Sequence, residues 1–405
     1  LSLLFTMTSL TTNSSTTPKR YIIDQWDDEN LNLKQSLLRG IYAFGFEKPS
    51  AIQKQALYPM TVHPANDIIA QAQSGTGKTG AFVTGTLQII DEKNPVTQAL
   101  ILAPTHELAL QTKQVMDDIG RFLKIKTQLL VGGTSVENDK KQLLENTPHV
   151  VIGTPGRVHD MFRRKYLIAS TMKVLVIDEA DEMLSSGFKE QMYKIFQYMP
   201  NEIQIGLFSA TMPDDLQELT QKFMRNPIKI LVKAEQLTLQ GIAQYYINLE
   251  DDVQKYECLK DLFQSLTISQ AIIYCNSTRR VDDLQEAMEA DGFPVKKIHG
   301  KMPDVERKAT HKEFKTGGCR VLITSDLFAR GIDVQQVSIV INFDIPRNEH
   351  TYLHRIGRSG RWGRKGIAIN FQTKHDATRL KKFEDYYQTQ ISEMPSDYTK
   401  HLGLQ

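Results

Sequence analysis

Cysteine is scarce in this chain of 405 residues, and long hydrophobic runs are missing. The three cysteines, Cys258, Cys275 and Cys319, are too few for a disulfide framework and lie at no spacing typical of metal ligands. We therefore expect a reducing, intracellular compartment. No stretch approaches the roughly 20 apolar residues that cross a bilayer, and the first residues lack the basic segment of a signal peptide. These absences argue against a membrane-spanning or secreted protein.

An excess of charge of either sign is also missing. The chain has 49 Lys and Arg against 47 Asp and Glu, a formal net charge of +2. A surface for a polyanion must then be a local patch. Hydrophobic residues make up 40% and charged residues 24%, as in ordinary soluble globular proteins, and the length suits two or three domains. Residues 1–20 are rich in Ser and Thr, and we expect a disordered tail there.

Short apolar runs, each followed at once by small or polar residues, recur along the chain. Such runs are typical of parallel strands buried on both faces. Segments with helical periodicity lie between them, for example Leu108, Val115, Ile119 and Phe122, and this alternation predicts a doubly wound α/β sheet. The runs are at residues 68–70, 99–103, 150–152, 174–177 and 205–208, and then at 271–274, 321–323 and 337–341.

The pattern lapses once, near the middle of the chain, where the sequence turns polar. We place a linker at residues 233–241, a first domain at 21–232 and a second at 242–405. The predicted fold is therefore two tandem α/β domains with parallel sheets. Because ligands of open α/β sheets bind at the carboxyl ends of the strands, the polar residues at those ends predict one composite site.

A glycine-rich loop follows the first predicted strand. Glycines let backbone N–H groups surround phosphate oxygens, and the next helix adds partial positive charge at its N-terminus. Lys78 is expected to reach the β- and γ-phosphates of a nucleotide, and the Thr79 hydroxyl to ligate Mg²⁺. The general pattern begins with glycine, so a glycine-rich turn without a ligand stays open as the alternative. The loop runs Ala72-Gln73-Ser74-Gly75-Thr76-Gly77-Lys78-Thr79.

An acidic cluster, Asp178-Glu179-Ala180-Asp181, follows a later strand. ATP hydrolysis needs one acid to hold the Mg²⁺ shell and a second to orient or deprotonate the attacking water. We assign Asp178 to the metal, directly or through water, and Glu179 to the water. An acidic cluster alone is more often a solvated surface, so the assignment depends on the phosphate loop that accompanies it.

With that loop, the tetrapeptide resembles the signature of the DEAD-box ATP-dependent RNA helicases, and the similarity runs from about residue 26 to 395. The resemblance implies that both domains are of the P-loop NTPase (RecA-like) type. The segment 44–53 resembles the family's Q motif. The resemblance implies that Phe46 stacks on adenine and that Gln53 reads it, since one amide donor and one acceptor match N7 and N6 of that base. Ser209 and Thr211 resemble the Ser-Ala-Thr motif, which implies that they couple Asp181 to RNA binding.

In the second half, the segment 354–361 resembles the family's arginine-finger motif. The resemblance implies that Arg358 and Arg361 face the γ-phosphate, where guanidinium groups stabilise the developing charge. It also implies that His354 couples the two domains and that Asp333 contacts the ribose. Because the phosphates are held by one domain and the arginines come from the other, hydrolysis should require the domains to close.

The resemblance implies a second set of residues that bind RNA. Small side chains and backbone amides at strand ends can hold phosphates without reading bases, so little sequence specificity is expected. Two positions depart from the family pattern: His106 stands where the family has arginine, which we expect to weaken one phosphate contact, and Lys301 reverses the charge of an aspartate. The implied RNA residues are Pro104, Thr105, Gly132, Gly133, Thr154, Pro155, Gly156, Arg157, Asn276, Arg279 and Thr324.

Within the family, the chain resembles the eukaryotic initiation factor 4A subfamily, which is nearly all core. We expect a cytoplasmic, monomeric RNA helicase of translation initiation that uses ATP and Mg²⁺, unwinds RNA locally, works with scaffold proteins and binds no membrane. An ATP-gated RNA clamp, as in the exon junction complex, and a nuclear or nucleolar helicase of ribosomal-RNA processing stay open. A GTPase is disfavoured, because the chain has no Asn-Lys-x-Asp sequence and Gln53 suits adenine.

Overall fold

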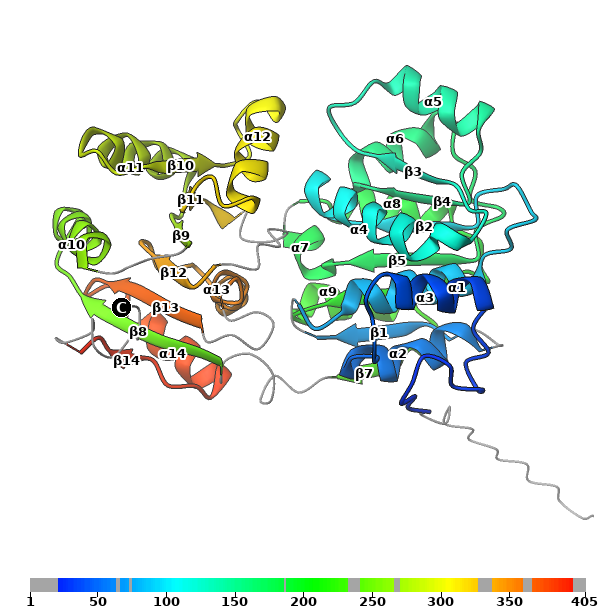
Figure 1. Ribbon diagram of the computed structural model, residues 1–405, viewed down its shortest axis with the longest axis horizontal. Helices are drawn as coiled ribbons and strands as arrows, with labels where there is room; N and C mark the ends of the chain where they lie inside the picture. Colours follow the sequence, from blue (N-terminus) through cyan, green and yellow to red (C-terminus); the bar gives the residue numbers. More distant parts are fainter. Residues whose placement is uncertain are drawn as a thin grey trace, which may run out of the picture.

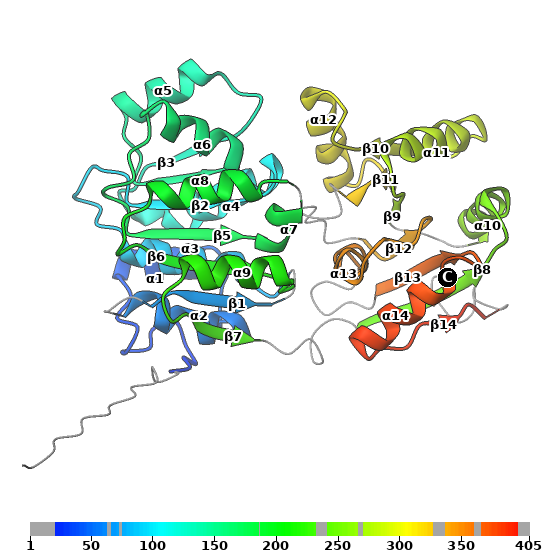
Figure 2. The same cartoon turned by 180° about the vertical axis from the view of Figure 1, so that it is seen from behind.

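The computed structural model describes residues 21–62, 66–72, 75–185, 187–231, 241–265, 270–326, 337–359 and 366–395. These residues form two lobes, each built on a seven-stranded sheet in which every strand pair is parallel. Figure 1 shows the lobes side by side, and Figure 2 shows the same arrangement from behind. The predicted fold class, two tandem parallel-sheet domains, is confirmed.

The first lobe has the strand order β3-β4-β2-β5-β6-β1-β7. Its central strands are buried on both faces, which explains why their sequences are continuously apolar rather than alternating. The strands are β1 (Ile68–Gln71), β2 (Ala99–Leu102), β3 (Thr127–Leu130), β4 (Val150–Gly153), β5 (Val174–Asp178), β6 (Gln204–Ser209) and β7 (Ile228–Leu231).

Helices cover both faces of this sheet. Alternate residues of each strand point to opposite faces, so Ala70 and Ile101 pack on the first group of helices while Ile69 and Leu100 pack on the second. The first group is α1 (Gln35–Ala43), α2 (Ala51–Thr61), α3 (Lys78–Ile89), α4 (His106–Ile119) and the 3₁₀ turn η1 (Gly120–Phe122). The second is α5 (Val136–Glu145), α6 (Pro155–Arg163), α7 (Ala180–Ser185), α8 (Lys189–Tyr198) and α9 (Asp214–Phe223).

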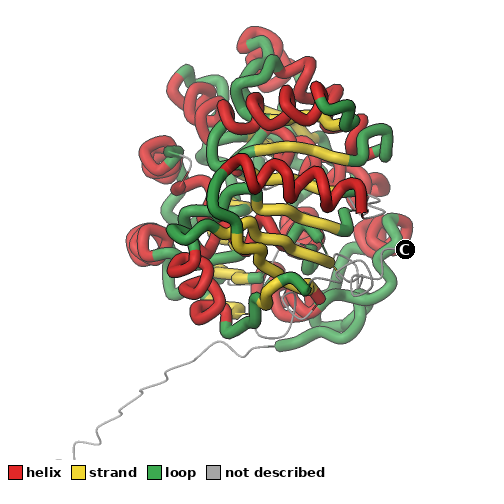
Figure 3. The backbone as a smooth tube through the Cα atoms, turned by 90° about the vertical axis from the view of Figure 1, so that its left-hand side faces the viewer, coloured by secondary structure: helices red, strands yellow, loops and turns green. Residues whose placement is uncertain are grey.

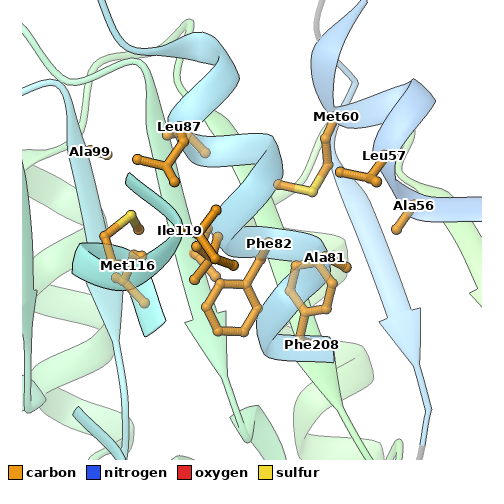
Figure 4. Packing of buried hydrophobic residues seen from close by; sticks show 14 of the residues in the cluster. Ala56, Leu57, Met60, Ala81, Phe82, Leu87, Ala99, Met116, Ile119 and Phe208 are labelled. Carbon is orange, nitrogen blue, oxygen red and sulfur yellow. The ribbon is translucent and has the colours of Figure 1, made fainter. Parts of the chain in front are cut away.

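The core on the first face is centred on α3. Phe82 of α3 lies against Phe208 of β6 with ring centroids 5.1 Å apart, and Met60 of α2 approaches the same helix (Figure 4). This packing fixes α3, and with it the phosphate loop that precedes α3, on the carboxyl end of β1.

The second lobe repeats the architecture of the first. Its order, β10-β11-β9-β12-β13-β8-β14, matches the first lobe strand for strand when both are numbered from their own first strand. Figure 3 shows strands lying between helices on either side. The strands are β8 (Ile242–Asn248), β9 (Ala271–Tyr274), β10 (Val295–Ile298), β11 (Val321–Thr324), β12 (Ile339–Asn342), β13 (Gly366–Gln372) and β14 (Ser392–Glu393).

Two groups of helices cover the second sheet as well. The first group packs on the face that carries Ile273 and Ile341, and the second on the face that carries Ile272 and Val340 or, further along the sheet, Ala368. The first group is α10 (Asp252–Ser265) and α11 (Thr278–Ala290), and the second is α12 (Asp304–Lys315), α13 (Glu349–Ile356) and α14 (Ala377–Tyr387).

The boundary between the lobes falls where the sequence loses its pattern. Strands up to Leu231 belong to the first sheet, and strands from Ile242 belong to the second. The expected linker, 233–241, lies outside the described residues except for Gly241, and the expected tail, 1–20, lies outside them entirely. In the part of the chain that is described, no helix is long and apolar enough to span a membrane.

Candidate active site

The phosphate loop joins the end of β1 to the start of α3. Gly75 and Gly77 have φ values of 82° and 97°, a left-handed backbone that favours glycine. Lys78 is the first residue of α3 and is buried, and its Nζ donates to the carbonyl oxygen of Ala72 at 2.7 Å. The Lys78 ammonium is thereby held over the loop, at the helix N-terminus where an anion is best stabilised. Gln73 and Ser74 lie outside the described residues.

Gln53 connects the predicted adenine-binding segment to this loop. The residue lies in the first turn of α2, where its Oε1 accepts from the Ser50 N–H at 2.7 Å and closes a capping box. Its Nε2 donates to the carbonyl oxygen of Gly77 at 3.2 Å. One N–H and one lone pair of the amide stay available, which is what recognition of an adenine edge requires.

Phe46 lies beside Gln53 and is partly exposed. Its ring is edge-on to Phe44, with centroids 4.9 Å apart. A Cβ added to Gly80 would lie 2.6 Å from Gln53 Nε2 and 2.7 Å from Phe46 Cε2, so only glycine at this position lets the segment lie so close to α3. Phe46, Gln53 and the phosphate loop are therefore brought together.

The acidic cluster lies at the end of β5. In the sheet, β5 is the neighbour of β6, and β6 separates β5 from β1. Asp178 accepts from the Glu179 N–H at 3.0 Å, and Glu179 Oε1 lies 3.5 Å from Lys78 Nζ. Glu179 has a φ of 47°, a strained conformation for a non-glycine residue. Burial raises the pKa of Asp178 to about 7, and the adjacent Glu179 carboxylate contributes to the rise.

These carboxylates fit a divalent cation. Two buried acids with one lysine nearby leave negative charge that a hard cation would neutralise, and oxygen ligands are those that Mg²⁺ prefers. Among the described residues, no group of three or more His, Cys, Asp or Glu side chains is placed to hold a metal ion by itself. Mg²⁺ is commonly shared between one or two carboxylates, water and substrate phosphates, which is the arrangement this donor set suits.

A hydrogen-bonded group at Asp181 joins the two lobes. Thr211 donates its hydroxyl proton to Asp181 Oδ2, and Ser209 accepts from the Asp181 N–H at 3.4 Å. His354 Nε2 of the second lobe lies 3.1 Å from the same carboxylate oxygen, and both side chains are almost fully buried. All four residues expected to couple the lobes are therefore in one contiguous group. Figures 1 and 2 show α7 of the first lobe opposite α13 of the second.

The predicted arginine finger follows directly on α13. Arg358 is buried, and its Nε donates to the carbonyl oxygen of His354 at 3.1 Å, so its position is tied to the residue that contacts Asp181. Arg361 and Asp333 lie outside the described residues. The corresponding position of the second lobe has no phosphate loop: β8 is followed by Leu249-Glu250-Asp251-Asp252, which has no glycine and three acids. Of the two equivalent strand ends, only that of the first lobe therefore carries a phosphate loop.

The RNA residues expected in the first lobe lie at the ends of β2, β3 and β4, which are neighbours in the sheet. Thr105 caps α4 by accepting from the Leu108 N–H, Thr154 occupies the N-cap position of α6, and Gly132, Gly133 and Gly156 are exposed. Pro104 and Pro155 are buried. Arg157 is mostly buried and forms an ion pair with Asp139 and hydrogen bonds to Thr134, so in this arrangement its guanidinium holds the loop that follows Gly133.

The RNA residues expected in the second lobe differ in exposure. Arg279 is exposed, whereas Asn276 donates to the Ile345 carbonyl oxygen and accepts from Arg355. Thr324 is fully buried, and its hydroxyl donates to the Ile298 carbonyl oxygen. In this arrangement Thr324 presents no side-chain atom to a ligand.

Sequence reasoning missed Arg355, which has no exposed surface and ties four elements of the second lobe together. Its guanidinium donates to Asp326 at 2.6 Å, to the Asp344 carbonyl oxygen at 2.7 Å and to Asn276 at 2.8 Å. The sequence did contain a signal for the burial of Arg355. On a helix, Arg355 shares the inward-pointing part of α13 with the apolar Tyr352 and Ile356.

A second contact between the lobes was also missed. Arg307 Nε of α12 lies 3.2 Å from Glu107 Oε1 of α4, and each side chain is only 14% exposed. Glu107 follows His106, the first residue of α4, so this ion pair joins the second lobe to the element that begins with the predicted RNA residues Pro104 and Thr105.

The fold and the site together define a two-lobed P-loop ATPase whose lobes meet at the nucleotide site. Residues 50–219 match the DEAD/DEAH box helicase family model, and residues 254–363 match the helicase conserved C-terminal domain. The chain is 54% identical to eukaryotic initiation factor 4A of Caenorhabditis elegans, over 92% of each chain. It is also 54% identical to the ATP-dependent RNA helicase eIF4A of Neurospora crassa, over 92% of this chain and 93% of the relative.

The chain belongs to the DEAD-box family of ATP-dependent RNA helicases, within its eukaryotic initiation factor 4A subfamily, as the sequence predicted. Among solved structures, S. cerevisiae Dbp5 bound to RNA and ADP BeF3 is similar with a TM-score of 0.86 at 36% identity, over 92% of this chain and 96% of that one. A DEAD box protein from Methanococcus jannaschii is similar with a TM-score of 0.52 at 32% identity, over 92% of this chain and 100% of that one.

Proposed function

We propose that the protein is an RNA-dependent ATPase that unwinds or remodels RNA locally during translation initiation. The observation that carries the proposal is the group formed by Asp181, Thr211 and His354, because it links the acidic cluster of one lobe to the arginine-bearing helix of the other. ATP hydrolysis and a change in the relative position of the lobes are then one coupled event.

In this mechanism the first lobe holds the nucleotide. Gln53 and Phe46 bind adenine, and the loop from Ala72 to Thr79, including Gln73 and Ser74, binds the phosphates. Lys78 neutralises the β- and γ-phosphates, and Glu179 orients the attacking water. The distance of 3.5 Å between the Glu179 carboxylate and Lys78 Nζ supports a role for Glu179 beside the γ-phosphate.

The second lobe supplies positive charge and ribose contacts. Arg358 and Arg361 stabilise the charge that develops on the transferred phosphoryl group, and Asp333 binds the ribose. Mg²⁺ would be held by Thr79 and by Asp178, the latter directly or through water, together with the phosphates. The ion would supply electrostatic stabilisation of the leaving group.

RNA would lie across both lobes on the strand-end residues. In the first lobe these are Pro104, Thr105, Gly132, Gly133 and the α6 N-terminus from Thr154 to Arg157, and in the second they are Asn276, Arg279 and Thr324. The N-termini of α4 and α6 offer backbone N–H groups to phosphates, which binds a strand without reading its bases.

Two comparisons support these assignments. Curated relatives at 54% identity are named initiation factor 4A, and the Dbp5 structure that holds RNA and ADP BeF3 resembles this chain over both lobes. We propose domain limits of 21–232 and 242–405 with a linker at 233–241. We further propose a cytoplasmic monomer whose lobe closure is regulated by scaffold proteins.

The deciding experiment measures phosphate release by the purified protein with and without single-stranded RNA, and unwinding of a short RNA duplex. We expect RNA to stimulate hydrolysis, DNA of the same sequence to do so weakly, and Glu179→Gln to bind ATP and RNA without turnover. Hydrolysis that is indifferent to RNA would contradict the proposal.

The pathway needs a separate test. Proteins recovered from cytosol on the RNA-bound chain with a non-hydrolysable ATP analogue should include components of the cap-binding complex. Recovery of splicing-dependent or pre-ribosomal components in their place would reassign the helicase to one of those pathways.

A further inference from the structure

One surface of the second lobe carries an excess of unpaired positive charge. Five lysines between β10 and the end of α12 are exposed, and none of them forms an ion pair with any described residue. Elsewhere on the described helices, lysines commonly pair with acids one turn away, as Lys140 does with Glu137 and Lys194 with Glu190. We call the five the α12 lysine face: Lys296, Lys301, Lys308, Lys312 and Lys315.

Three of the five form a stripe along α12. Lys308, Lys312 and Lys315 are spaced by four and three residues, which places them on one side of the helix over about 10 Å of its length. Lys301 lies just before the helix and is exposed.

Lys296 belongs to the same surface because of strand alternation. Its neighbour Lys297 pairs with Asp282 of α11 at 2.7 Å, on the opposite face of edge strand β10. Ile298, two residues after Lys296, packs in the cluster that includes Phe314 of α12. Lys296 therefore points to the α12 side of the sheet edge.

Helix electrostatics explain only part of this face. Lys312 and Lys315 lie in the last turn of α12, where the helix dipole favours cations. Lys308, Lys301 and Lys296 are not in such a position. Like charges one turn apart destabilise a helix by about 0.2–0.5 kcal/mol per pair, so the stripe carries a cost that a bound anion would relieve.

We propose that the α12 lysine face binds the phosphate backbone of the RNA strand where that strand leaves the boundary between the lobes; this inference rests on the RNA-binding function proposed above. The position of the face supports it. Arg307, next to Lys308, contacts Glu107 of α4, and α4 begins at the predicted RNA residues Pro104 and Thr105. α12 therefore lies beside the predicted RNA residues of the first lobe.

The chemistry of the face favours RNA over an acidic protein segment. Lysine is a compact point charge that suits phosphates in any sequence, and it is depleted in the centres of protein–protein interfaces. Such interfaces are anchored by aromatic residues and arginine in desolvated pockets, whereas the only large apolar side chain exposed on α12 is Val305.

The test combines Lys308→Gln, Lys312→Gln and Lys315→Gln in the full chain. Binding of oligouridines from about 8 to about 30 nucleotides is measured with a non-hydrolysable ATP analogue at several salt concentrations. Each lost phosphate contact lowers the slope of log affinity against log salt by about 0.7, so the slope for long RNA should fall by about 2. Between 50 and 200 mM salt, the wild type should lose about 20-fold more affinity than the variant. The shortest RNA should show no difference.

A matched control removes three positive charges from the same lobe. All three are exposed: Lys374 precedes α14, and Lys381 and Lys382, which pair with nearby acids, lie in its middle, at the other end of the lobe from α12 (Figure 1). Their replacement by glutamine should leave the long-RNA slope at its wild-type value. If the control lowers the slope as much as the α12 variant does, the effect is one of net charge and the inference is overturned.

The remaining outcomes separate this inference from the proposed function. If the short RNA stimulates ATP hydrolysis and the α12 variant binds long RNA with an unchanged slope, the face does not bind RNA although the helicase assignment stands. If the variant keeps that slope but loses binding to a polyglutamate peptide, the face belongs to an acidic protein partner, which also overturns the inference. If no RNA stimulates hydrolysis in the wild type, the proposed function itself fails.

Discussion

At the scale of single residues, Gln53 illustrates how one side chain can serve both the fold and the site. Its oxygen completes the cap of α2, and its nitrogen is bound to the carbonyl oxygen of Gly77 in the phosphate loop. A change at this position can therefore act on stability, on nucleotide binding or on both. The two roles are separable because they use different atoms of the amide.

Gln53→Glu should separate them. The new carboxylate can still accept from the Ser50 N–H, but it loses the donor to Gly77 and places a negative charge near the phosphates. We expect ATP affinity to fall at least about tenfold, or about 1.4 kcal/mol, with little change in unfolding temperature. Gln53→Ala should add a loss of about 1 kcal/mol of stability, because the cap is then removed as well. Nucleotide titrations and thermal unfolding measure both effects, and equal ATP affinity in wild type and Gln53→Glu would show that the amide does not read adenine.

His149 gives the protein a pH dependence that is unrelated to catalysis. The ring is buried before β4, where its Nδ1 accepts from the Lys126 N–H at 3.0 Å. Burial, and then the charge of Lys126, lower its pKa below the ordinary 6.5. The unfolded chain therefore binds a proton below pH 6.5 that the folded chain does not.

The resulting stability is fully present above pH 6.5 and is lost as the pH falls below it, with a slope of at most about 1.4 kcal/mol per pH unit. His149→Asn can keep the hydrogen bond to Lys126 and cannot titrate. We expect the free energy of unfolding of the wild type to fall faster than that of His149→Asn between pH 6.5 and 5.5 in denaturant titrations. Parallel decreases would contradict this assignment.

The residues of the site differ in how far the sequence could predict them. Lys78, Glu179 and Gln53 could be proposed from the sequence, because phosphate and adenine chemistry demand particular residue types at particular spacings. The burial of Thr324 and the hydrogen bonds of Arg355 could not be, since both depend on packing between elements distant in the chain. Sequence periodicity shows which face of α13 points inward but not which acids and amides meet it.

At the scale of elements, burial explains many of the strands that the sequence predicted and some of those that it missed. β2, β5 and β9 are buried on both faces and read as continuous apolar runs. β8 and β10 were missed because they are partly exposed and contain polar residues, including Lys296 and Lys297 in β10. β10 is an edge strand and β8 lies one strand in from the other edge, and strands with only one or two buried side chains have sequences that resemble loops. β13 was missed as well, although six of its seven residues are buried.

The contact between α2 and α3 gives a prediction at this scale. Alanine at position 80 favours the helix by up to about 1 kcal/mol, but its Cβ would collide with Gln53 and Phe46, at a cost of about 1–3 kcal/mol if they cannot move. The side chains that must yield belong to the adenine site. Gly80→Ala should therefore lower ATP affinity about tenfold or more while leaving stability nearly unchanged, as measured by nucleotide titration and thermal unfolding.

Gly85→Ala is the matched control on the same helix pair. Its Cβ would meet the flexible end of Met60, away from the nucleotide. We expect it to change stability without changing ATP affinity. If both variants weakened ATP binding equally, the effect would come from a general shift of α2 rather than from the adenine site.

At the scale of the whole molecule, the two lobes have the same topology but differ in the residues that follow equivalent strands. The end of β1 carries a phosphate loop, whereas the equivalent end of β8 carries acids. Contacts that join the lobes among the described residues include the His354 contact to Asp181 beside the nucleotide site and the Arg307 contact to Glu107 beside the predicted RNA residues. A ligand at either place should favour the same closed arrangement.

This arrangement predicts reciprocal binding. A non-hydrolysable ATP analogue should raise RNA affinity by a factor of about 5–150, or about 1–3 kcal/mol, and RNA should raise affinity for the analogue by the same factor. His354→Ala removes the contact with Asp181, so both factors should shrink together while the affinity for each ligand alone stays within about threefold. His350→Ala, one turn earlier on α13 where the ring lies against Tyr386 of the same lobe, should leave both factors unchanged. Titrations of each ligand with and without the other measure the two factors, and coupling that survives in His354→Ala would mean that the lobes communicate through contacts other than that of His354 with the acidic cluster.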